Sequence, residues 1–300
     1  MTRTVSDPIF FNEDIAVKAG SRINVYKRVI TPLPWYGSKS RHLPWLLPLL
    51  PQCKHYVEPF GGSAVVLLNR DPSPIETYND INGEVVNFFR VLRDQPNELI
   101  TAIELTPSSR EEFALAIYDT AELTPLERAR RFCVLCQQAF GAAGNIATLS
   151  FWSSSVTHTF RGMSTTVSRV LAKQQNLAYV AQRLLTVQIE DRPALDCIKR
   201  YDSPDTLFYC DPPYVHETRR KNFNYSNNEM TTEEHKELAA LLNSVQGKVA
   251  LSGYEGDLYN DLYLSPKWTK HYDKRKGTTA AKNRSARQEV LWVNYNRGLF

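Results

Sequence analysis

Residues 206–214, with the sequence TLFYCDPPY, decide the predicted fold. The apolar run 206–210 is typical of a strand buried in a parallel sheet, because helices cover both faces of such a strand. Asp211 follows directly, and open α/β sheets bind ligands at the carboxyl ends of their strands. Pro212 and Pro213 fix the backbone and leave carbonyl groups outside any helix or ladder. The stretch therefore predicts an α/β protein with a site at Asp211.

The group from Asp211 to Tyr214 offers two acceptors and a flat aromatic face. Asp211 and the Pro212 carbonyl can each accept one N–H of an exocyclic amino group, while Tyr214 stacks on the ring that carries it. Such a site suits a planar base whose amine must be oriented, since its lone pair is delocalised into the ring. The alternative is a structural Pro-Pro turn with a buried Tyr, so a second site that supplies an electrophile is required.

A second site is indicated by residues 56–68, YVEPFGGSAVVLL, whose pattern is a strand end, a glycine turn and a helix expected at 64–69. Gly61 and Gly62 let the backbone approach a ligand closely. A further strand pattern ends at Asp80, an acid that can accept bonds from ribose hydroxyls. The sequence has no GxGxxG or GxxxxGK[ST] pattern, so these motifs favour a nucleoside without phosphates.

Four motifs, taken in order, resemble the Dam-type (D12 class, alpha group) DNA adenine-N6 methyltransferases. They are PWYGSK at 34–39, VEPFGG at 57–62, NDIN at 79–82 and DPPY at 211–214, with weaker similarity at 251–254 and 289–295. The resemblance implies S-adenosylmethionine as the methyl donor and double-stranded DNA as the partner. It also implies that the target base is flipped and that the N6 amino group of adenine attacks the methyl group directly.

The resemblance implies the site residues as well. Asp211, Pro212 and Tyr214 would hold the adenine and are the predicted catalytic residues. Seven residues would surround the cofactor, with Asp80 on the ribose hydroxyls: Trp35, Lys39, Phe60, Gly61, Gly62, Asp80 and Asp211. The glycine loop is one residue shorter than the VEPFxGxG form of the Dam pattern, and Gly37-Ser38 stands where many relatives have two glycines.

The predicted fold class is α/β, a Rossmann-like S-adenosylmethionine-dependent methyltransferase sheet with an inserted, mostly helical target-recognition domain. Helical patterns give way near residue 141 to a Gly-, Ser- and aromatic-rich stretch, and α/β patterning returns near 184. We therefore expect an N-terminal extension at 1–27, a discontinuous catalytic domain at 28–104 and 181–300, and the target-recognition domain at 105–180. Further strands are expected at 184–189, 248–252 and 289–294, and helices at 84–92, 109–118, 125–140 and 232–242.

Basic residues suggest where DNA would bind, although the net charge of +4 is modest. The predicted contacts are two arginines in the insert and a basic, aromatic segment after the catalytic turn: Arg128, Arg131, Arg219, Arg220, Lys221 and Tyr225. The alternative for the insert arginines is a solvated helix face. Residues 150–155 and 158–161 are candidates for groove contacts.

Composition bounds the remaining functions. Five cysteines, with a CxxC pair at Cys133 and Cys136 in an apolar helical stretch, predict buried free thiols rather than disulfides or zinc. No metal is expected, because the sulfonium already supplies the electrophile. The N-terminal 20 residues lack an apolar signal core, and the apolar stretch 43–51 is too short to span a bilayer. These features predict a cytoplasmic protein without a membrane partner.

Two alternatives to the leading hypothesis come from other classes. One is an S-adenosylmethionine-dependent methyltransferase acting on a nucleobase amine in RNA, against which a target-recognition insert upstream of DPPY argues. The other is a non-catalytic DNA-binding relative, against which the complete set of chemical residues argues. A cognate restriction enzyme is the further partner considered, while the recognition sequence and the oligomeric state stay open.

Overall fold

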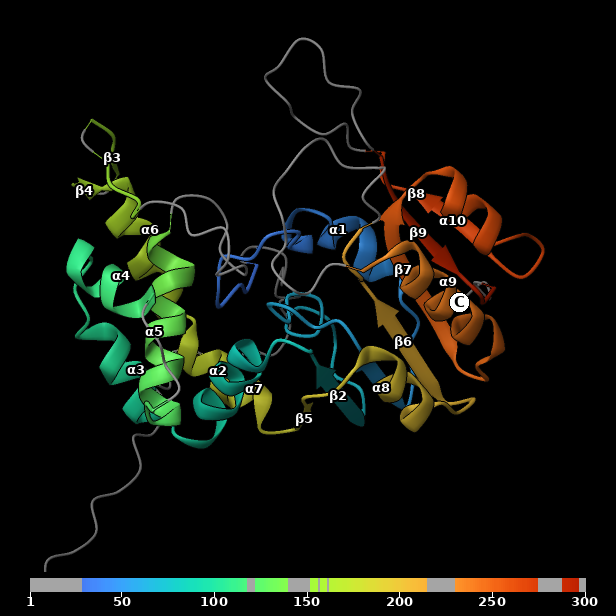
Figure 1. The fold of residues 1–300 in the computed structure, drawn as a ribbon, viewed down its shortest axis with the longest axis horizontal. Helices are drawn as coiled ribbons and strands as arrows, with labels where there is room; N and C mark the ends of the chain where they lie inside the picture. Colours follow the sequence, from blue (N-terminus) through green and yellow to red (C-terminus); the bar gives the residue numbers. More distant parts are fainter. Residues whose placement is uncertain are drawn as a thin grey trace, which may run out of the picture.

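The computed structural model describes residues 29–117, 122–139, 152–155, 157–160, 162–214, 230–274 and 288–296. Its main feature is a seven-stranded sheet in the order β5-β2-β1-β6-β7-β9-β8. The strands from β5 to β7 run parallel, whereas β9 is antiparallel to both of its neighbours. Figure 1 shows this sheet at one end of the molecule and a group of helices at the other. The predicted α/β, Rossmann-like class is confirmed.

Most of the predicted strands are present. The sheet consists of β1 His55–Glu58, β2 Ile75–Asn79, β5 Val187–Glu190, β6 Thr206–Cys210, β7 Lys248–Tyr254, β8 Thr269–Tyr272 and β9 Glu289–Val293, and β3 Thr159–Phe160 pairs with β4 Met163–Ser164 in a separate sheet. The strand predicted at 184–189 begins only at Val187, because Leu184 still belongs to a helix face. Strand β8 was not predicted, because its sequence, TKHY, is that of a polar edge strand.

The helices cover both faces of the sheet or form the helical end of the molecule. They are η3 Lys39–Arg41, α1 Leu43–Leu46, η4 Leu47–Leu49, α2 Gly83–Asp94, α3 Pro96–Glu104, α4 Arg110–Ile117, α5 Pro125–Gln138, α6 Thr165–Gln174, α7 Leu177–Leu184, α8 Ala194–Tyr201, α9 Thr232–Ser244 and α10 Asp257–Leu262. The helices predicted at 84–92, 109–118, 125–140 and 232–242 correspond to α2, α4, α5 and α9. Within the described residues, no helix is both long enough and apolar enough to cross a membrane.

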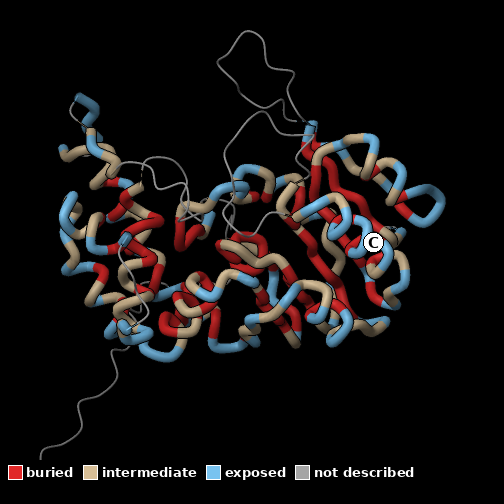
Figure 2. Tube along the Cα trace, in the orientation of Figure 1, coloured by how far each residue is buried: buried red, intermediate tan, exposed pale blue. Residues whose placement is uncertain are grey.

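Alternating side chains of each strand bind the sheet to its two helical layers. In β6, Leu207 and Tyr209 pack into one apolar cluster with α1, α2 and α7. Phe208 and Cys210 point the other way, into a second cluster with α8, α9 and α10. Figure 2 shows the buried residues running along these strands. Strand β6 is buried at every position because it lies between two layers of helices.

Helix α5 joins the helical end of the molecule to the core of the sheet. Its residues Phe132, Cys133 and Cys136 pack into the same cluster as α2, while Val134 and Leu135 pack against α4. Both thiols of the CxxC pair are buried and free, as predicted. Because one helix serves two apolar clusters, the helical end shares its core with the layer that covers the sheet.

The helix expected at 64–69 does not form. The segment makes successive turns, with Ala64 at a φ of 55° directly after the glycine loop. The side-chain amide of Asn69 donates to the carbonyls of Val65 (2.7 Å) and Ile30 (2.8 Å). This side chain satisfies a carbonyl that an α-helix would bond through its backbone, so the apolar pattern produces turns. The predicted N-terminal extension, 1–27, lies outside the described residues.

Candidate active site

The two principal motifs meet where the direction of the sheet order reverses. Strands β1 and β6 are parallel neighbours, and the chain leads outward from them in opposite directions. Such a switch point opens a crevice at the carboxyl ends of the strands. The loop of Phe60 to Gly62 follows β1, and Asp211 to Tyr214 follow β6. The fold thus brings the glycine motif and the DPPY motif to the same edge of the sheet.

Lys39 connects the N-terminal motif to this edge. Its Nζ lies 2.8 Å from Asp211 Oδ1 and 3.6 Å from Glu289 Oε1, and it donates to the Gly37 carbonyl at 3.2 Å. The side chain is buried, which disfavours its charge, but the charges of Asp211 and Glu289 outweigh burial and raise the pKa of Lys39. The site therefore contains a permanent ammonium group between two carboxyl groups.

Three contacts fix the ring of Tyr214. Its hydroxyl donates to Glu289 Oε1, and its ring meets Tyr254 edge-on, with centroids 4.6 Å apart at 77°. The Lys39 Nζ lies 4.8 Å from the centroid of the Tyr214 ring, within the range of a cation–π interaction. Burial raises the pKa of the Tyr214 hydroxyl well above its ordinary value, so the hydroxyl stays a donor.

Pro212 presents the second acceptor that the sequence predicted. The residue is buried. Within the described part of the chain, no donor bonds to its carbonyl group. A carbonyl oxygen has two lone pairs, so this group can accept a bond from a ligand.

The glycine loop is shaped by contacts within the protein. A Cβ on Gly61 would lie 2.2 Å from Tyr78 Cε2, and the Gly61 amide donates to the Asn79 carbonyl at 2.8 Å. Gly62 has a φ of +48°, and a Cβ there would lie 2.7 Å from Trp35 Nε1. Both glycines are therefore required by packing on Tyr78 and Trp35. The contact also brings the predicted cofactor residue Trp35 against the loop, while Phe60 packs against the second apolar cluster.

Asp80 occupies the end of β2, beside the glycine loop. Its carboxylate oxygens accept from the amides of Gly62 (2.7 Å) and Asn82 (2.8 Å). Burial raises the pKa of the Asp80 carboxyl, those two amides oppose the rise, and the nearby charge of Asp191 adds to it. Each carboxylate oxygen has a second lone pair, so Asp80 can still accept bonds from hydroxyl groups. Asp191, which follows β5, had no recognisable motif in the sequence.

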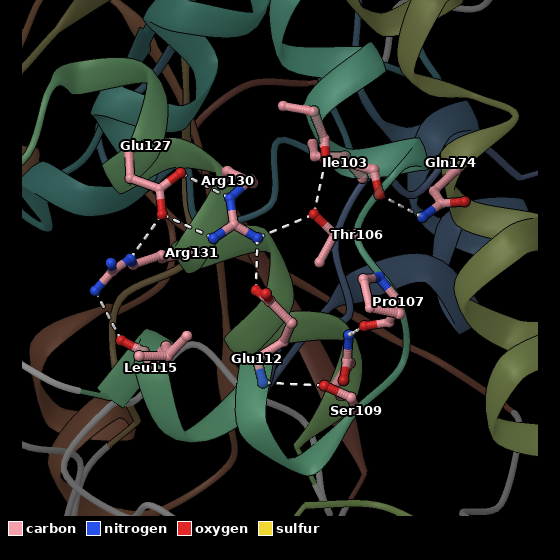
Figure 3. A network of polar contacts seen from close by, with 12 residues as sticks. Ile103, Thr106, Pro107, Ser109, Glu112, Leu115, Glu127, Arg130, Arg131 and Gln174 are labelled. Carbon is pink, nitrogen blue, oxygen red and sulfur yellow. Dashed lines mark hydrogen bonds and ion pairs between the residues drawn. The ribbon is translucent and has the colours of Figure 1, made fainter.

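The two predicted DNA-binding arginines that the structure describes, Arg128 and Arg131, are engaged within the chain. Arg128 forms an ion pair with Glu84 of α2. Arg131 donates to Glu127 Oε1 and to the Leu115 carbonyl, both at 2.8 Å, as Figure 3 shows. Arg219, Arg220, Lys221 and Tyr225 lie outside the described residues. The DNA-binding role of all six therefore stays a prediction.

Glu289 and Tyr254 are the members of the cluster that were not predicted as site residues. Both lie in stretches with weaker similarity to the family, 251–254 and 289–295, and they face each other across the β7–β9 ladder. The signal that could have identified Glu289 is an acid at the start of an otherwise apolar strand, EVLWV. Glu289 is only 5% exposed. Among the residues that the structure describes, no group of three metal-binding side chains occurs.

The geometry and the motif order agree with a known family. The model of the D12 class N6 adenine-specific DNA methyltransferases matches residues 35–279, which is most of the chain. The chain belongs to this family. It is therefore an adenine-specific DNA methyltransferase, and the resemblance carried by the four sequence motifs is confirmed. Membership favours DNA over RNA as the substrate, and an enzyme over a non-catalytic relative.

Curated proteins support the same assignment. A DNA adenine methylase of Vibrio cholerae is 26% identical over 213 residues, which cover 69% of this chain and 73% of that protein. The type II methyltransferase M1.LlaDCHI of Lactococcus lactis subsp. cremoris is 23% identical over 295 residues, covering 87% and 94%. The DNA N-6-adenine-methyltransferase of Escherichia phage P1 is 25% identical over 244 residues, covering 76% of the methyltransferase but 30% of the phage protein. Similarity to the first two thus extends over most of both chains.

Proposed function

We propose that the methyltransferase transfers a methyl group from S-adenosylmethionine to the N6 amino group of adenine in duplex DNA, after the base is flipped out of its stack. The observation that carries this proposal is the cluster of Asp211, Pro212 and Tyr214 beside the glycine loop at the switch point of the sheet. It combines two acceptors with an aromatic face at the edge of the sheet that also carries the glycine loop and Asp80.

The residues beside the glycine loop fit S-adenosylmethionine. Asp80 retains acceptor capacity for ribose hydroxyls, and Trp35 lies against Gly62. Two carboxyl groups face one ammonium at Asp211, Glu289 and Lys39, which leaves acceptor charge for a cationic ligand. When bound, S-adenosylmethionine supplies a methyl group on a sulfonium. We infer that Trp35, Lys39, Phe60, Gly61, Gly62, Asp80 and Asp211 hold it.

The role of the DPPY motif is to orient the amine. Asp211 and the Pro212 carbonyl each accept one N–H of the adenine, so that its nitrogen approaches tetrahedral geometry and its lone pair points at the methyl carbon. The nitrogen gains the methyl group as the carbon–sulfur bond breaks, and one N6 proton then passes to solvent. Tyr214 stacks on the base. A separate general base is not required, because the methylated amine is cationic before it loses its proton.

We infer that residues 105–180 form the target-recognition domain, set between the catalytic segments 28–104 and 181–300. The β3–β4 pair in this insert supports that inference, since Phe160 is 58% exposed beside the predicted groove contacts at 158–161. The predicted DNA contacts are Arg128, Arg131, Arg219, Arg220 and Lys221 on phosphates, with Tyr225 for stacking. Flipping a base costs about a few kcal/mol, which such contacts would offset. A cognate restriction enzyme is the further partner we propose, to be tested by whether methylated DNA resists cleavage.

The deciding experiment uses labelled S-adenosylmethionine with unmethylated genomic DNA, total RNA and protein as competing acceptors. The wild type and Asp211→Ala are compared, and the modified nucleoside is identified by mass. We expect label in DNA as N6-methyladenine, and none with Asp211→Ala. Methylation of DNA by Asp211→Ala would contradict the catalytic role of Asp211. Label found in RNA would mean that the substrate is RNA and not DNA.

A further inference from the structure

Glu289 is a charged residue of the site cluster to which the mechanism above gives no role in orienting the base. It begins β9, opposite Tyr254 of β7, and only 5% of it is exposed. Its Oε1 accepts the Tyr214 hydroxyl bond and lies 3.6 Å from the Lys39 Nζ. A single carboxyl group therefore contacts both the predicted stacking ring and the cation that also pairs with Asp211.

The charges around Glu289 are unequal in number. Lys39 is the ammonium common to two carboxyl groups, Asp211 at 2.8 Å and Glu289 at 3.6 Å. With both acids ionised, the cluster carries one excess negative charge. Burial raises the pKa of Glu289, Lys39 opposes the rise and Asp211 adds to it. A buried carboxylate is unfavourable in isolation, so the Glu289 carboxylate requires a compensating cation or a functional role.

We propose that Glu289 is a positioning residue for methyl transfer, whose carboxylate holds the Tyr214 hydroxyl and draws the Lys39 ammonium away from exclusive pairing with Asp211. Asp211 then keeps acceptor capacity for the adenine amine. The excess negative charge favours a sulfonium cation over its neutral thioether product. This inference rests on the proposed function, because it assumes that Asp211 and Tyr214 hold the base.

The first test measures binding in place of turnover. S-adenosylmethionine and S-adenosylhomocysteine differ at sulfur, which is cationic in the first and neutral in the second. In Glu289→Gln, we expect calorimetry to show about tenfold weaker binding of S-adenosylmethionine, with S-adenosylhomocysteine bound to within about twofold of wild type. A purely structural role would weaken both ligands together. Equal losses, or no change in either, would overturn the proposal.

The chain offers a matched control at Glu255. This carboxylate also accepts from a tyrosine hydroxyl, Tyr272 at 3.0 Å, and pairs with a lysine, Lys270 at 3.2 Å. Its side chain is 43% exposed, and its partners are Lys270 and Tyr272 rather than Asp211 or Tyr214. We expect Glu255→Gln to leave the preference for S-adenosylmethionine and the rate of methyl transfer unchanged. A loss equal to that of Glu289→Gln would show that the effect is not specific to the cluster.

Two further variants separate the charge of Glu289 from its hydrogen bond. Glu289→Asp keeps the charge but is too short to keep both contacts, so it should restore the preference for S-adenosylmethionine. Tyr214→Phe keeps the ring but removes the hydroxyl, so it should lower kcat more than it raises KM for DNA. Glu289→Ala and Tyr214→Phe each remove one partner of the same hydrogen bond, so their losses of kcat should combine less than additively. Fully additive losses would contradict the shared contact.

Asp211→Ala and thermal unfolding distinguish the ways in which the inference can fail. If Asp211→Ala still methylates DNA, the proposed function fails. If Asp211→Ala is inactive while Glu289→Gln matches wild type in both ligand affinities and kcat, only the inference about Glu289 fails. If the Glu289→Gln protein does not fold, Glu289→Asp and Tyr214→Phe decide the same point: the first should keep the preference for S-adenosylmethionine, and the second should lower kcat. A lost preference in Glu289→Asp or an unchanged kcat in Tyr214→Phe would overturn the proposal.

Discussion

The methyltransferase contains two ion-pair clusters of similar composition and different placement. At the carboxyl ends of the strands, one buried ammonium, Lys39, is shared by Asp211 and Glu289. On α4 and α5, Arg130 and Arg131 face Glu112 and Glu127 in a network that Figure 3 displays. In the first cluster the acids exceed the cation; in the second, two arginines meet two acids. The two clusters therefore differ in net charge. The first can attract a cation, whereas the charges of the second neutralise one another.

The number of basic residues in a segment does not by itself identify a DNA-binding surface in this protein. The segment 126–183 holds more basic than acidic residues, which suggests a phosphate-binding face. In the structure, the Arg130 guanidinium donates hydrogen bonds to Glu127, Glu112 and Thr106, at 2.7 to 2.9 Å. A guanidinium held by three partners is positioned to join α4 to α5. A basic helix is therefore not equivalent to a DNA-binding surface, because acids distant in the sequence can neutralise it.

The largest effect is expected where the strand-end cluster loses the negative charge of Asp211. Asp211→Asn keeps the shape of the side chain but removes the charge that pairs with Lys39. We expect kcat to fall by at least about 100-fold, the size associated with losing one preorganised electrostatic group. Steady-state methylation of DNA measures the rate. A variant with full activity would remove the catalytic distinction between the two clusters.

Burial should also make strand-end acids sensitive to pH. Burial raises the pKa of Glu58, which ends β1 and accepts from Tyr56, to about 8. The folded protein then binds more protons than the unfolded chain. The contribution of Glu58 protonation to the free energy of unfolding is therefore fully present at low pH, and it is lost as the pH rises toward 8. We expect Glu58→Gln to match wild type near about pH 4 and to be more stable by about 2–4 kcal/mol near about pH 8. Urea unfolding at both pH values tests this, and a constant difference would contradict it.

The arginine cluster should respond in stability rather than in DNA affinity. The Arg130 side chain is 13% exposed and binds both Glu112 and Glu127. Arg130→Gln leaves those acids partly unpaired, and we expect it to lower the free energy of unfolding by about 1–3 kcal/mol. The salt dependence of DNA binding should not change. A reduced salt slope with normal stability would mean that Arg130 contacts phosphate and that the arginine cluster belongs to the DNA-binding surface.

Arg128 provides the smallest and most discriminating test. Its side chain is 31% exposed and pairs with Glu84 alone among the ion pairs of the described residues. If it exchanges that partner for a phosphate, Arg128→Gln should weaken DNA binding and reduce the slope of log K against log salt by about 1. Affinity measured over a series of salt concentrations supplies the slope. An unchanged slope would place Arg128 with Arg130, among residues that act within the chain.

Local pattern predicted most of the fold. Strand β6 could be predicted because four apolar residues precede an acid and two prolines, and α5 because Thr124 caps a regular apolar periodicity. The turns at 64–69 could not, because their apolar residues fit a helix equally well until Asn69 meets the Ile30 carbonyl. Edge strand β8 carried no apolar signal at all.

The sequence by itself determined which chemical groups the methyltransferase carries and at which strand ends they lie, because short motifs and strand patterns are local properties of the chain. Only the tertiary structure decided their partners. Tyr214 and Glu289 are 75 positions apart, and they meet because β9 inserts beside β7 in the sheet. The same folding brings Lys39 between two acids, and it pairs Arg128 and Arg130 with acids from other helices. Charge balance at a site is a sum over such distant neighbours, so no single segment of sequence can contain it.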